Sequence, residues 1–176
     1  MTEQHDRGAV IENWWRKSIA DRTNGRARAL AARLRRAEGI EVLAEPEVHA
    51  LAARLGLKSM RAEELIQLVQ VLAQVRESSA QNLAQRLGGG DPQPVSPLRF
   101  QRLLRARGID LVTALRRTLP IVDRRCNVAT LGRDLLNWDH PDFGDKVRTR
   151  WSFAYFSTPY ANAATTLNET PPEIEP

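Results

Sequence analysis

Apolar residues recur every three or four positions along nearly the whole chain, and this spacing limits the fold more than any other feature. The clearest stripe consists of Leu65, Leu68, Val69, Leu72 and Val75. A repeat of this kind predicts an amphipathic helix with one buried face. No segment alternates in the two-residue period of a half-buried strand. We therefore expect an all-α fold.

Further stripes predict helices on both sides of this one. Their apolar positions fall within residues 10–19, 27–34, 48–55, 100–104, 111–119, 128–138 and 143–155. Residues that favour helix ends accompany them: Ser59 and Asn127 are expected N-caps, and Gly56 is an expected C-terminal glycine. Ser96 followed by Pro97 is typical of an N-cap and first helical residue.

One internal segment interrupts the helical pattern. Residues 88–97 contain three glycines and three prolines, which favour turns and block regular pairing. We predict a linker here, joining one helical bundle over residues 1–87 to a second over residues 98–156. Residues 157–176 are small and polar, with three glutamates and no lysine or arginine, so we predict a disordered acidic tail.

Composition excludes several classes of protein. No apolar run approaches the roughly 18 residues that a transmembrane helix requires, and the first eight residues lack the hydrophobic core of a secretory signal. Cys126 is the only cysteine, which rules out an intrachain disulfide and a cysteine-rich zinc site. We expect a soluble, intracellular, cytoplasmic protein.

Positive charge is concentrated in a short stretch of the chain. The formal net charge is +5, yet residues 99–125 alone carry eight arginines against Asp110 and Asp123, a local charge of +6. These arginines are Arg99, Arg102, Arg105, Arg107, Arg116, Arg117, Arg124 and Arg125. An ordinary solvated helix face mixes signs, so this field favours a polyanion, either nucleic acid or an acidic protein surface.

Helical geometry places part of this charge outside the apolar stripes. At about 100° per residue, Arg102 and Arg105 lie opposite the apolar side of their helix, and Arg117 points away from the stripe of the next. Two neighbouring helices would then present one arginine surface, whose planar forks can bind phosphate oxygens in pairs. A weaker candidate set is Arg26, Arg28 and Arg36, where Glu38 and Glu41 compete through intrahelical ion pairs.

Aromatic residues and potential catalytic groups give no further site. Trp14, Trp138 and Trp151 are in phase with apolar stripes and are expected in the core, whereas Trp15 lies just off its stripe, at a bundle edge or interface. The three histidines are far apart, and Gly88–Gly90 lacks the Lys-Ser/Thr of a phosphate-binding loop. We expect no metal, no cofactor and no enzymatic activity.

The ordered set of motifs resembles a known family. It comprises Gly25-Arg-Ala-Arg-Ala-Leu-Ala-Ala-Arg-Leu-Arg-Arg36, Leu98-Arg-Phe-Gln-Arg-Leu-Leu-Arg105, Leu115-Arg-Arg117, Leu131-Gly-Arg-Asp-Leu-Leu-Asn-Trp138 and Val147-Arg-Thr-Arg-Trp-Ser-Phe-Ala-Tyr-Phe156. Together these motifs resemble the CasB family, the small subunit of the type I-E CRISPR Cascade surveillance complex. The resemblance covers most of residues 10–156 and is densest over 98–156.

That resemblance implies an all-helical, non-catalytic subunit that pairs head to tail with a second copy. It would contact the other Cascade subunits, including those that coat the guide RNA, and hold the displaced non-target DNA strand so that the R-loop is stabilised. The residues carried over are Arg102, Arg105, Arg116 and Arg117, then Arg99, Arg107, Arg124 and Arg125, and last Arg26, Arg28 and Arg36.

Two other functions stay open at this point. One is a standalone helical DNA-binding regulator, with a helix-turn-helix in residues 65–87 broken near Ser78-Ser79. The other is an assembly scaffold whose arginines bind acidic proteins.

Overall fold

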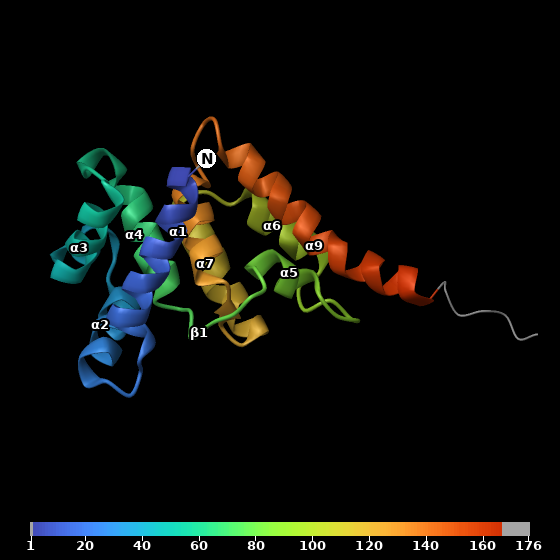
Figure 1. Ribbon diagram of the computed structural model, residues 1–176, viewed down its shortest axis with the longest axis horizontal. Helices are drawn as coiled ribbons and strands as arrows, with labels where there is room; N and C mark the ends of the chain where they lie inside the picture. Colours follow the sequence, from blue (N-terminus) through green and yellow to red (C-terminus); the bar gives the residue numbers. More distant parts are fainter. Residues whose placement is uncertain (1, 167–176) are drawn as a thin grey trace, which may run out of the picture.

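A computed structural model describes the backbone of residues 2–166 and the side chains of residues 7–157, and its architecture is all-α, as predicted (Figure 1). The helices are α1 (Thr2–Trp15), α2 (Gly25–Arg36), α3 (Pro46–Leu55), α4 (Ala62–Leu72), α5 (Leu83–Gly88), α6 (Pro97–Arg105), α7 (Gly108–Thr118), α8 (Val128–Asn137) and α9 (Gly144–Thr166). Shorter helical turns are η1 (Arg16–Ala20), η2 (Gly39–Ala44), η3 (Ser59–Arg61) and η4 (Leu119–Val122).

Two short strands were not expected from the sequence. β1 (Glu77–Ser78) pairs in parallel with β2 (Arg125–Cys126), so that Glu77 lies opposite Arg125 and Ser78 opposite Cys126. A strand of two residues is too short to show the alternation of apolar and polar side chains, so the sequence pattern did not indicate these strands. The pairing fixes the chain after α4 against the chain before α8.

Most predicted helix ends agree with the structure. Gly56 adopts the left-handed conformation, with φ of 65°, and the Asn127 side chain accepts a hydrogen bond from the Thr130 amide at 2.8 Å. The prediction that Ser59 is an N-cap was wrong. This residue lies in η3, and α4 begins only at Ala62, with Arg61 at the N-cap position and no side-chain cap.

The tryptophans all lie in the core, which confirms three expectations and corrects one. Trp14, Trp138 and Trp151 are buried, as predicted. Trp15 is also buried, with 3% of its surface exposed, and its Nε1 donates to the Leu72 carbonyl oxygen at 3.2 Å. The prediction of an edge or interface was wrong because α1 is covered by α8 and by α3, so it buries more than one face.

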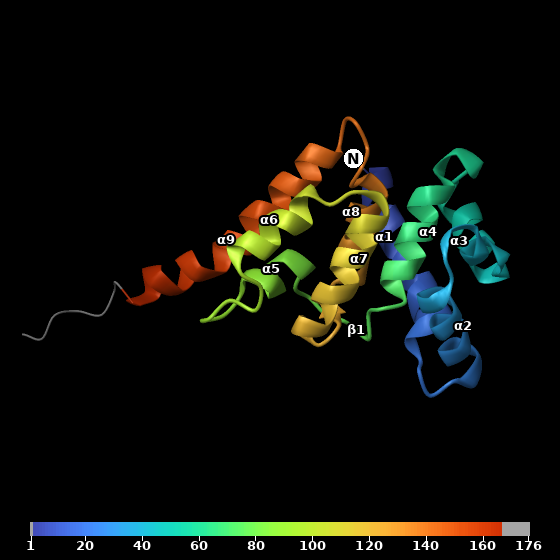
Figure 2. The ribbon, with the colours of Figure 1, turned by 180° about the vertical axis from the view of Figure 1, so that it is seen from behind.

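Helices from both predicted bundles pack together. α1 lies against α8, α4 against α7 and α8, and α5 against α9 (Figures 1 and 2). The buried apolar side chains form one continuous cluster from Ile11 to Tyr155. The division into two separate bundles, residues 1–87 and residues 98–156, therefore stays a prediction about folding units. In the folded chain the two parts share one core.

The Gly/Pro segment is packed onto α9 at its two ends. Gly88 lies directly on the backbone of Tyr155, where a Cβ atom would have no room. The Tyr155 ring stacks on Phe100, with ring centroids 4.0 Å apart, and its hydroxyl donates to the Val95 carbonyl oxygen at 2.5 Å. These contacts fix where α6 begins.

α9 extends past the predicted start of the acidic tail. It continues to Thr166, so the backbone of residues 157–166 is helical, and the disorder of residues 157–176 stays a prediction. The remaining residues, 167–176, lie outside the described part of the chain. Among the residues described, no helix combines the length and apolarity needed to span a bilayer.

Candidate nucleic-acid interface

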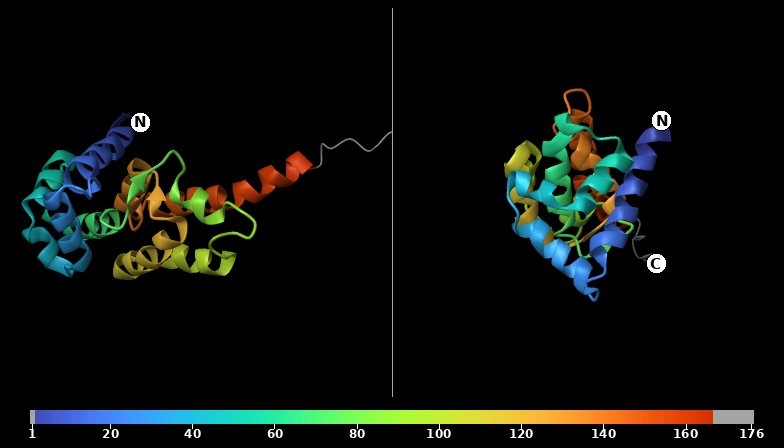
Figure 3. Two further views of the ribbon diagram at one scale, coloured as in Figure 1. Left: turned by 90° about the horizontal axis from the view of Figure 1, so that it is seen from below. Right: turned by 90° about the vertical axis from the view of Figure 1, so that its left-hand side faces the viewer.

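An arginine-lined groove lies between α6 and α7. These two helices run along one edge of the molecule (Figure 3). Arg99 and Arg102 come from α6 and Arg117 from α7, and they border a hollow of about 420 Å³. Its other lining residues are Val95, Leu103, Ala114, Thr118 and Ile121. We call this feature the α6–α7 groove.

The helical pattern explains why these side chains meet. Phe100 and Leu103 bury the inner face of α6, which leaves Arg99 and Arg102 exposed on the outer side. Leu111 and Leu115 do the same for α7 and leave Arg117 exposed. The prediction that two helices present one arginine surface is thus confirmed for Arg99, Arg102 and Arg117.

No carboxylate neutralises the α6–α7 groove. Within the described part of the chain, none of the three groove arginines lies within 4.0 Å of an acidic side chain. α6 contains no acidic residue, and the one on α7, Asp110, lies in its first turn, far along the helix from Arg117. Arg105 is exposed on α6 and, over the same residues, equally free of acids, but it lies outside the hollow.

Two arginines of the same basic stretch are engaged elsewhere. Arg107 forms an ion pair with Asp139 at 3.3 Å, and its Nη1 donates to the carbonyl oxygens of Leu104 and Ala106 at 2.9 Å. Arg125 pairs with Glu77 across the β1–β2 ladder at 2.6 Å. Neither borders the groove, so a role for them in binding an anion stays a prediction.

Arg116 and Arg124 point into the protein more than expected. Arg116 is half-buried, and its Nε and Nη2 atoms are shielded from solvent with no hydrogen-bond partner among the described residues. Arg124 donates from Nη1 to the Gln74 side-chain oxygen at 3.0 Å. Helical phase alone does not indicate how deeply a neighbouring helix covers the flank of α7 on which Arg116 lies.

The α2 arginines are partly neutralised, by acids other than those expected. Arg26 pairs at 3.1 Å with Glu47, in the first turn of α3, and Arg33 pairs at 2.5 Å with Glu45, at the N-cap position of α3. Glu38 and Glu41, the expected competitors, instead form a capping box at the start of η2. Arg28 and Arg36 are exposed and have no ion pair within the described chain.

Sequence reasoning missed a second group of basic residues. Arg22, Arg35 and Arg76 lie near Arg124, and together these four form what we call the four-arginine cluster. Burial, followed by the charges of Arg76, Arg35 and Arg124, lowers the pKa of Arg22 to about 10. No local pattern joins them, because they come from four separate segments. Arg35 and Arg124 belong to basic stretches recognised in the sequence, whereas Arg22 and Arg76 do not.

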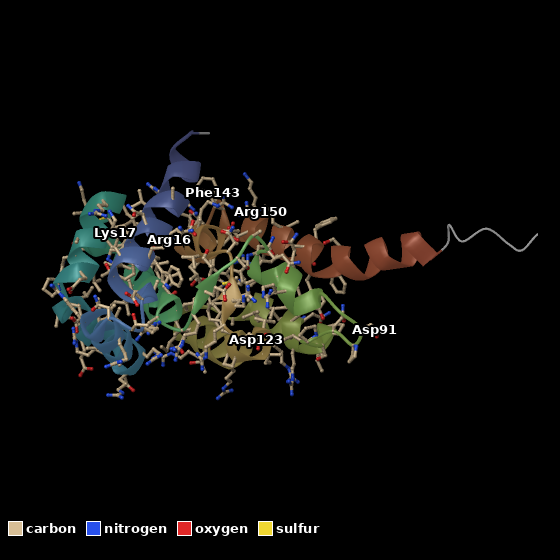
Figure 4. The ribbon with its side chains drawn as sticks, turned by 60° about the horizontal axis from the view of Figure 1, so that its bottom comes forward. Arg16, Lys17, Asp91, Asp123, Phe143 and Arg150 are labelled. Atoms are coloured by element: carbon tan, nitrogen blue, oxygen red, sulfur yellow. The ribbon has the colours of Figure 1, made fainter. Side chains whose placement is uncertain are left out.

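The basic side chains extend over more than one element. In Figure 4, nitrogen-tipped side chains project along the lower edge of the molecule, from the blue α2 towards the olive α6 and α7. The arrangement provides fixed, positively charged hydrogen-bond donors that suit phosphate oxygens.

Catalytic and metal-binding groups do not assemble in the same way. Among the described residues, no three His, Cys, Asp or Glu side chains are placed to hold a metal ion. Burial raises the pKa of the Cys126 thiol to about 12, so the thiol stays protonated near neutral pH and is a poor nucleophile.

Comparison with known proteins gives one family and several related folds. The family model for CRISPR-associated protein Cse2 matches residues 30–156. A search of curated proteins found no match.

Solved structures share the fold at low sequence identity. A CRISPR-associated protein of the Cse2 family from Thermus thermophilus superposes with a TM-score of 0.67 at 22% identity, covering 85% of this chain and 97% of that one. CasB of M. ruber gives a TM-score of 0.63 at 19% identity, with coverages of 91% and 98%. A chain of E. coli Cascade, solved with a PAM-containing double-stranded DNA target, gives 0.59 at 20% identity, with coverages of 88% and 96%.

Proposed function

The chain belongs to the CRISPR-associated Cse2 family, and on that premise we propose that it is a non-catalytic small subunit of a type I-E Cascade complex that holds nucleic acid by its sugar–phosphate backbone. The strand it holds is the displaced non-target DNA strand. Exchanging a DNA duplex for an RNA–DNA heteroduplex is nearly balanced in free energy, so backbone contacts from protein can tip the exchange. Binding here would therefore stabilise the R-loop, in a cytoplasmic complex.

The observation that carries this proposal is the α6–α7 groove without acids. Three arginines from two helices border one hollow, and each has a planar fork that can bridge two phosphate oxygens. Contacts of this kind position a strand without reading its sequence. A subunit that must accept any target sequence needs that property.

A standalone regulator with a helix-turn-helix has less support. α5, which would be the second helix, has six residues, and its Leu83, Ala84 and Leu87 are buried. β1 also lies between α4 and α5 and pairs with β2. No exposed recognition face is left on α5, and its one basic residue, Arg86, donates to the Val122 carbonyl oxygen at 3.2 Å.

Exposed apolar side chains support contacts with other subunits. Ile40 and Met60, exposed by 79% and 89%, lie in the N-terminal part, and Phe153, exposed by 76%, lies on α9 at the other side of the molecule (Figure 1). A head-to-tail contact joins two different surfaces of the same chain. The proposal therefore includes head-to-tail pairing with a second copy, beside contacts with the other Cascade subunits that carry the guide RNA.

The test compares two variants that lose the same charge. Arg99→Gln/Arg102→Gln/Arg117→Gln removes the groove arginines, and Arg26→Gln/Arg33→Gln/Arg125→Gln removes three that are paired with acids. Affinity for a single-stranded oligonucleotide, measured by fluorescence anisotropy, should fall roughly 100-fold in the first variant, because each exposed phosphate contact contributes on the order of 1 kcal/mol. The second variant should change little.

The salt dependence gives an independent measure. Binding of single strands weakens with a slope of roughly −0.7 per phosphate neutralised, so the groove variant should show a slope shallower by about 2. Equal losses in both variants would reduce the effect to net charge, and no loss in either would contradict the proposal. Binding of acidic proteins without binding of DNA would favour a scaffold instead.

A further inference from the structure

The four-arginine cluster is built around the turn that follows α4. Arg22, in the loop after η1, donates from Nη2 to the carbonyl oxygens of Ala73 and Val75 at 3.1 and 3.3 Å. Arg124 approaches the same turn from the other side and donates to the Gln74 side-chain oxygen at 3.0 Å.

Backbone contacts bring the remaining members together. The Arg76 amide donates to the Arg124 carbonyl oxygen at 2.8 Å, which joins these two residues directly. Arg35 lies in the last turn of α2, close enough for its charge to act on Arg22. Four distant segments thus supply one guanidinium group each to a single small region.

Two neighbouring acids are occupied by other partners, and Asp123, next to Arg124, forms no ion pair with the cluster among the described residues. Asp21, next to Arg22, accepts hydrogen bonds from the Thr23 hydroxyl at 2.6 Å and the Thr23 amide at 3.0 Å. Glu77, next to Arg76, pairs with Arg125. Within the described residues no member of the cluster forms an ion pair, and the buried Nε of Arg22 has no hydrogen-bond partner.

This arrangement opposes folding. Burial, together with the charges of Arg76 and Arg124, lowers the pKa of Arg35 as it does that of Arg22, which shows that the positive charges repel one another. Arg124 also adopts a φ of 55°, a left-handed conformation that a non-glycine residue rarely adopts. Features that cost folding free energy persist where a function needs them.

The cluster adjoins both basic surfaces already described. Arg124 lies three residues after Ile121, which lines the α6–α7 groove. Arg35 is on α2, next to the exposed Arg36. An extended strand leaving the groove towards α2 would therefore pass the cluster.

We propose that the four-arginine cluster is a second phosphate-binding site, which takes a phosphodiester group of the strand held in the α6–α7 groove. This rests on the proposed function for the identity of the strand. Several guanidinium forks around one small site suit a tetrahedral anion with several oxygens better than a planar carboxylate. The anion would also relieve the repulsion among the arginines, so binding and stability are linked.

The experiment uses Arg35→Gln/Arg76→Gln, which leaves the hydrogen bonds of Arg22 and Arg124 in place. Its melting temperature without ligand should equal or exceed that of the wild type, because repulsion is reduced. Its affinity for a single-stranded oligonucleotide should nevertheless fall about tenfold, in line with two lost phosphate contacts. Arg54→Gln/Lys58→Gln removes two exposed charges outside the cluster and should bind as the wild type does.

Inorganic pyrophosphate tests the site without DNA. It should raise the melting temperature of the wild type and of the groove variant Arg99→Gln/Arg102→Gln/Arg117→Gln, and adding Arg35→Gln/Arg76→Gln to the groove variant should abolish that rise. A fall in melting temperature of the cluster variant without ligand would overturn the inference, since the arginines would then be structural. Equal stabilisation by a glutamate peptide would overturn the choice of phosphate.

The two proposals fail in different ways. If the groove variant loses DNA and the cluster variant keeps it, the function stands and the second site is wrong. If both variants bind DNA as the wild type does while pyrophosphate still requires Arg35 and Arg76, the cluster is an anion site and the proposed function is wrong.

Discussion

α2 and α6 carry arginines at similar density, yet within the described chain only α6 keeps all of its arginines out of ion pairs. α2 has five arginines in 12 residues, and two of them pair with Glu45 and Glu47. α6 has three in nine residues, and none is paired within the described chain. The positive electrostatic field at a surface therefore depends on where the folded chain places its acidic side chains. The number of arginines in a stretch of sequence does not determine that field.

The largest of three further effects should come from giving the groove an acid of its own. Ala114 lines the hollow and lies one turn before Arg117 on α7, so Ala114→Glu would pair with that arginine as the acids beside α2 do. We expect affinity for single-stranded DNA to fall on the order of tenfold, as one phosphate contact is replaced by an ion pair and like charge is added. Anisotropy titration measures this, and the neutral Ala114→Gln is the matched control. An equal loss in the control would indicate a steric effect.

Removing the acids that pair with α2 should change DNA affinity by a smaller factor and in the opposite direction. Glu45→Gln/Glu47→Gln would release Arg33 and Arg26 and make α2 resemble the α6–α7 groove. We expect a gain of roughly two- to fivefold in affinity at low salt and a salt slope steeper by about 1, as added free charge strengthens phosphate binding. Glu38→Gln, which leaves both ion pairs intact, is the control. Unchanged binding would mean that α2 does not meet the strand.

The smallest expected effect on DNA affinity distinguishes Arg107 from Arg105, two arginines of the same basic stretch. Arg107 is held by Asp139 and by the end of α6, so Arg107→Gln should lower stability by about 1 kcal/mol and leave DNA affinity almost unchanged. Arg105→Gln, two positions away and unpaired, should do the reverse, with little change in stability and a few-fold loss of affinity. Thermal denaturation and anisotropy on both variants check this. A loss of affinity as large in the first as in the second would break the comparison.

Features set by local chemistry could be predicted from the sequence. Gly56 and Asn127 end and begin helices through contacts within a few residues, so composition at those positions is sufficient. The outward face of α6 was predictable for the same reason, because Phe100 and Leu103 determine which side is buried.

Features that depend on distant segments could not be predicted in this way. Trp15 is buried because two other elements cover α1, and Arg125 is neutralised by Glu77, 48 positions away. The four-arginine cluster combines four segments, and nothing in any one of them indicates that it meets the other three. In each case the deciding contact is tertiary, and periodicity carries no information about it.

The contact between α1 and α8 bears on how the chain is made. α1 is translated before α8, but Ile11 reaches its site only when Gly132 has emerged from the ribosome, because the missing side chain of that glycine leaves room for it. Contacts between segments so far apart in sequence slow folding, and until then the side of α1 that packs against α8 stays open to other chains. Fragments that stop before α8 should therefore aggregate during synthesis, because α1 completes its packing only long after it has been translated.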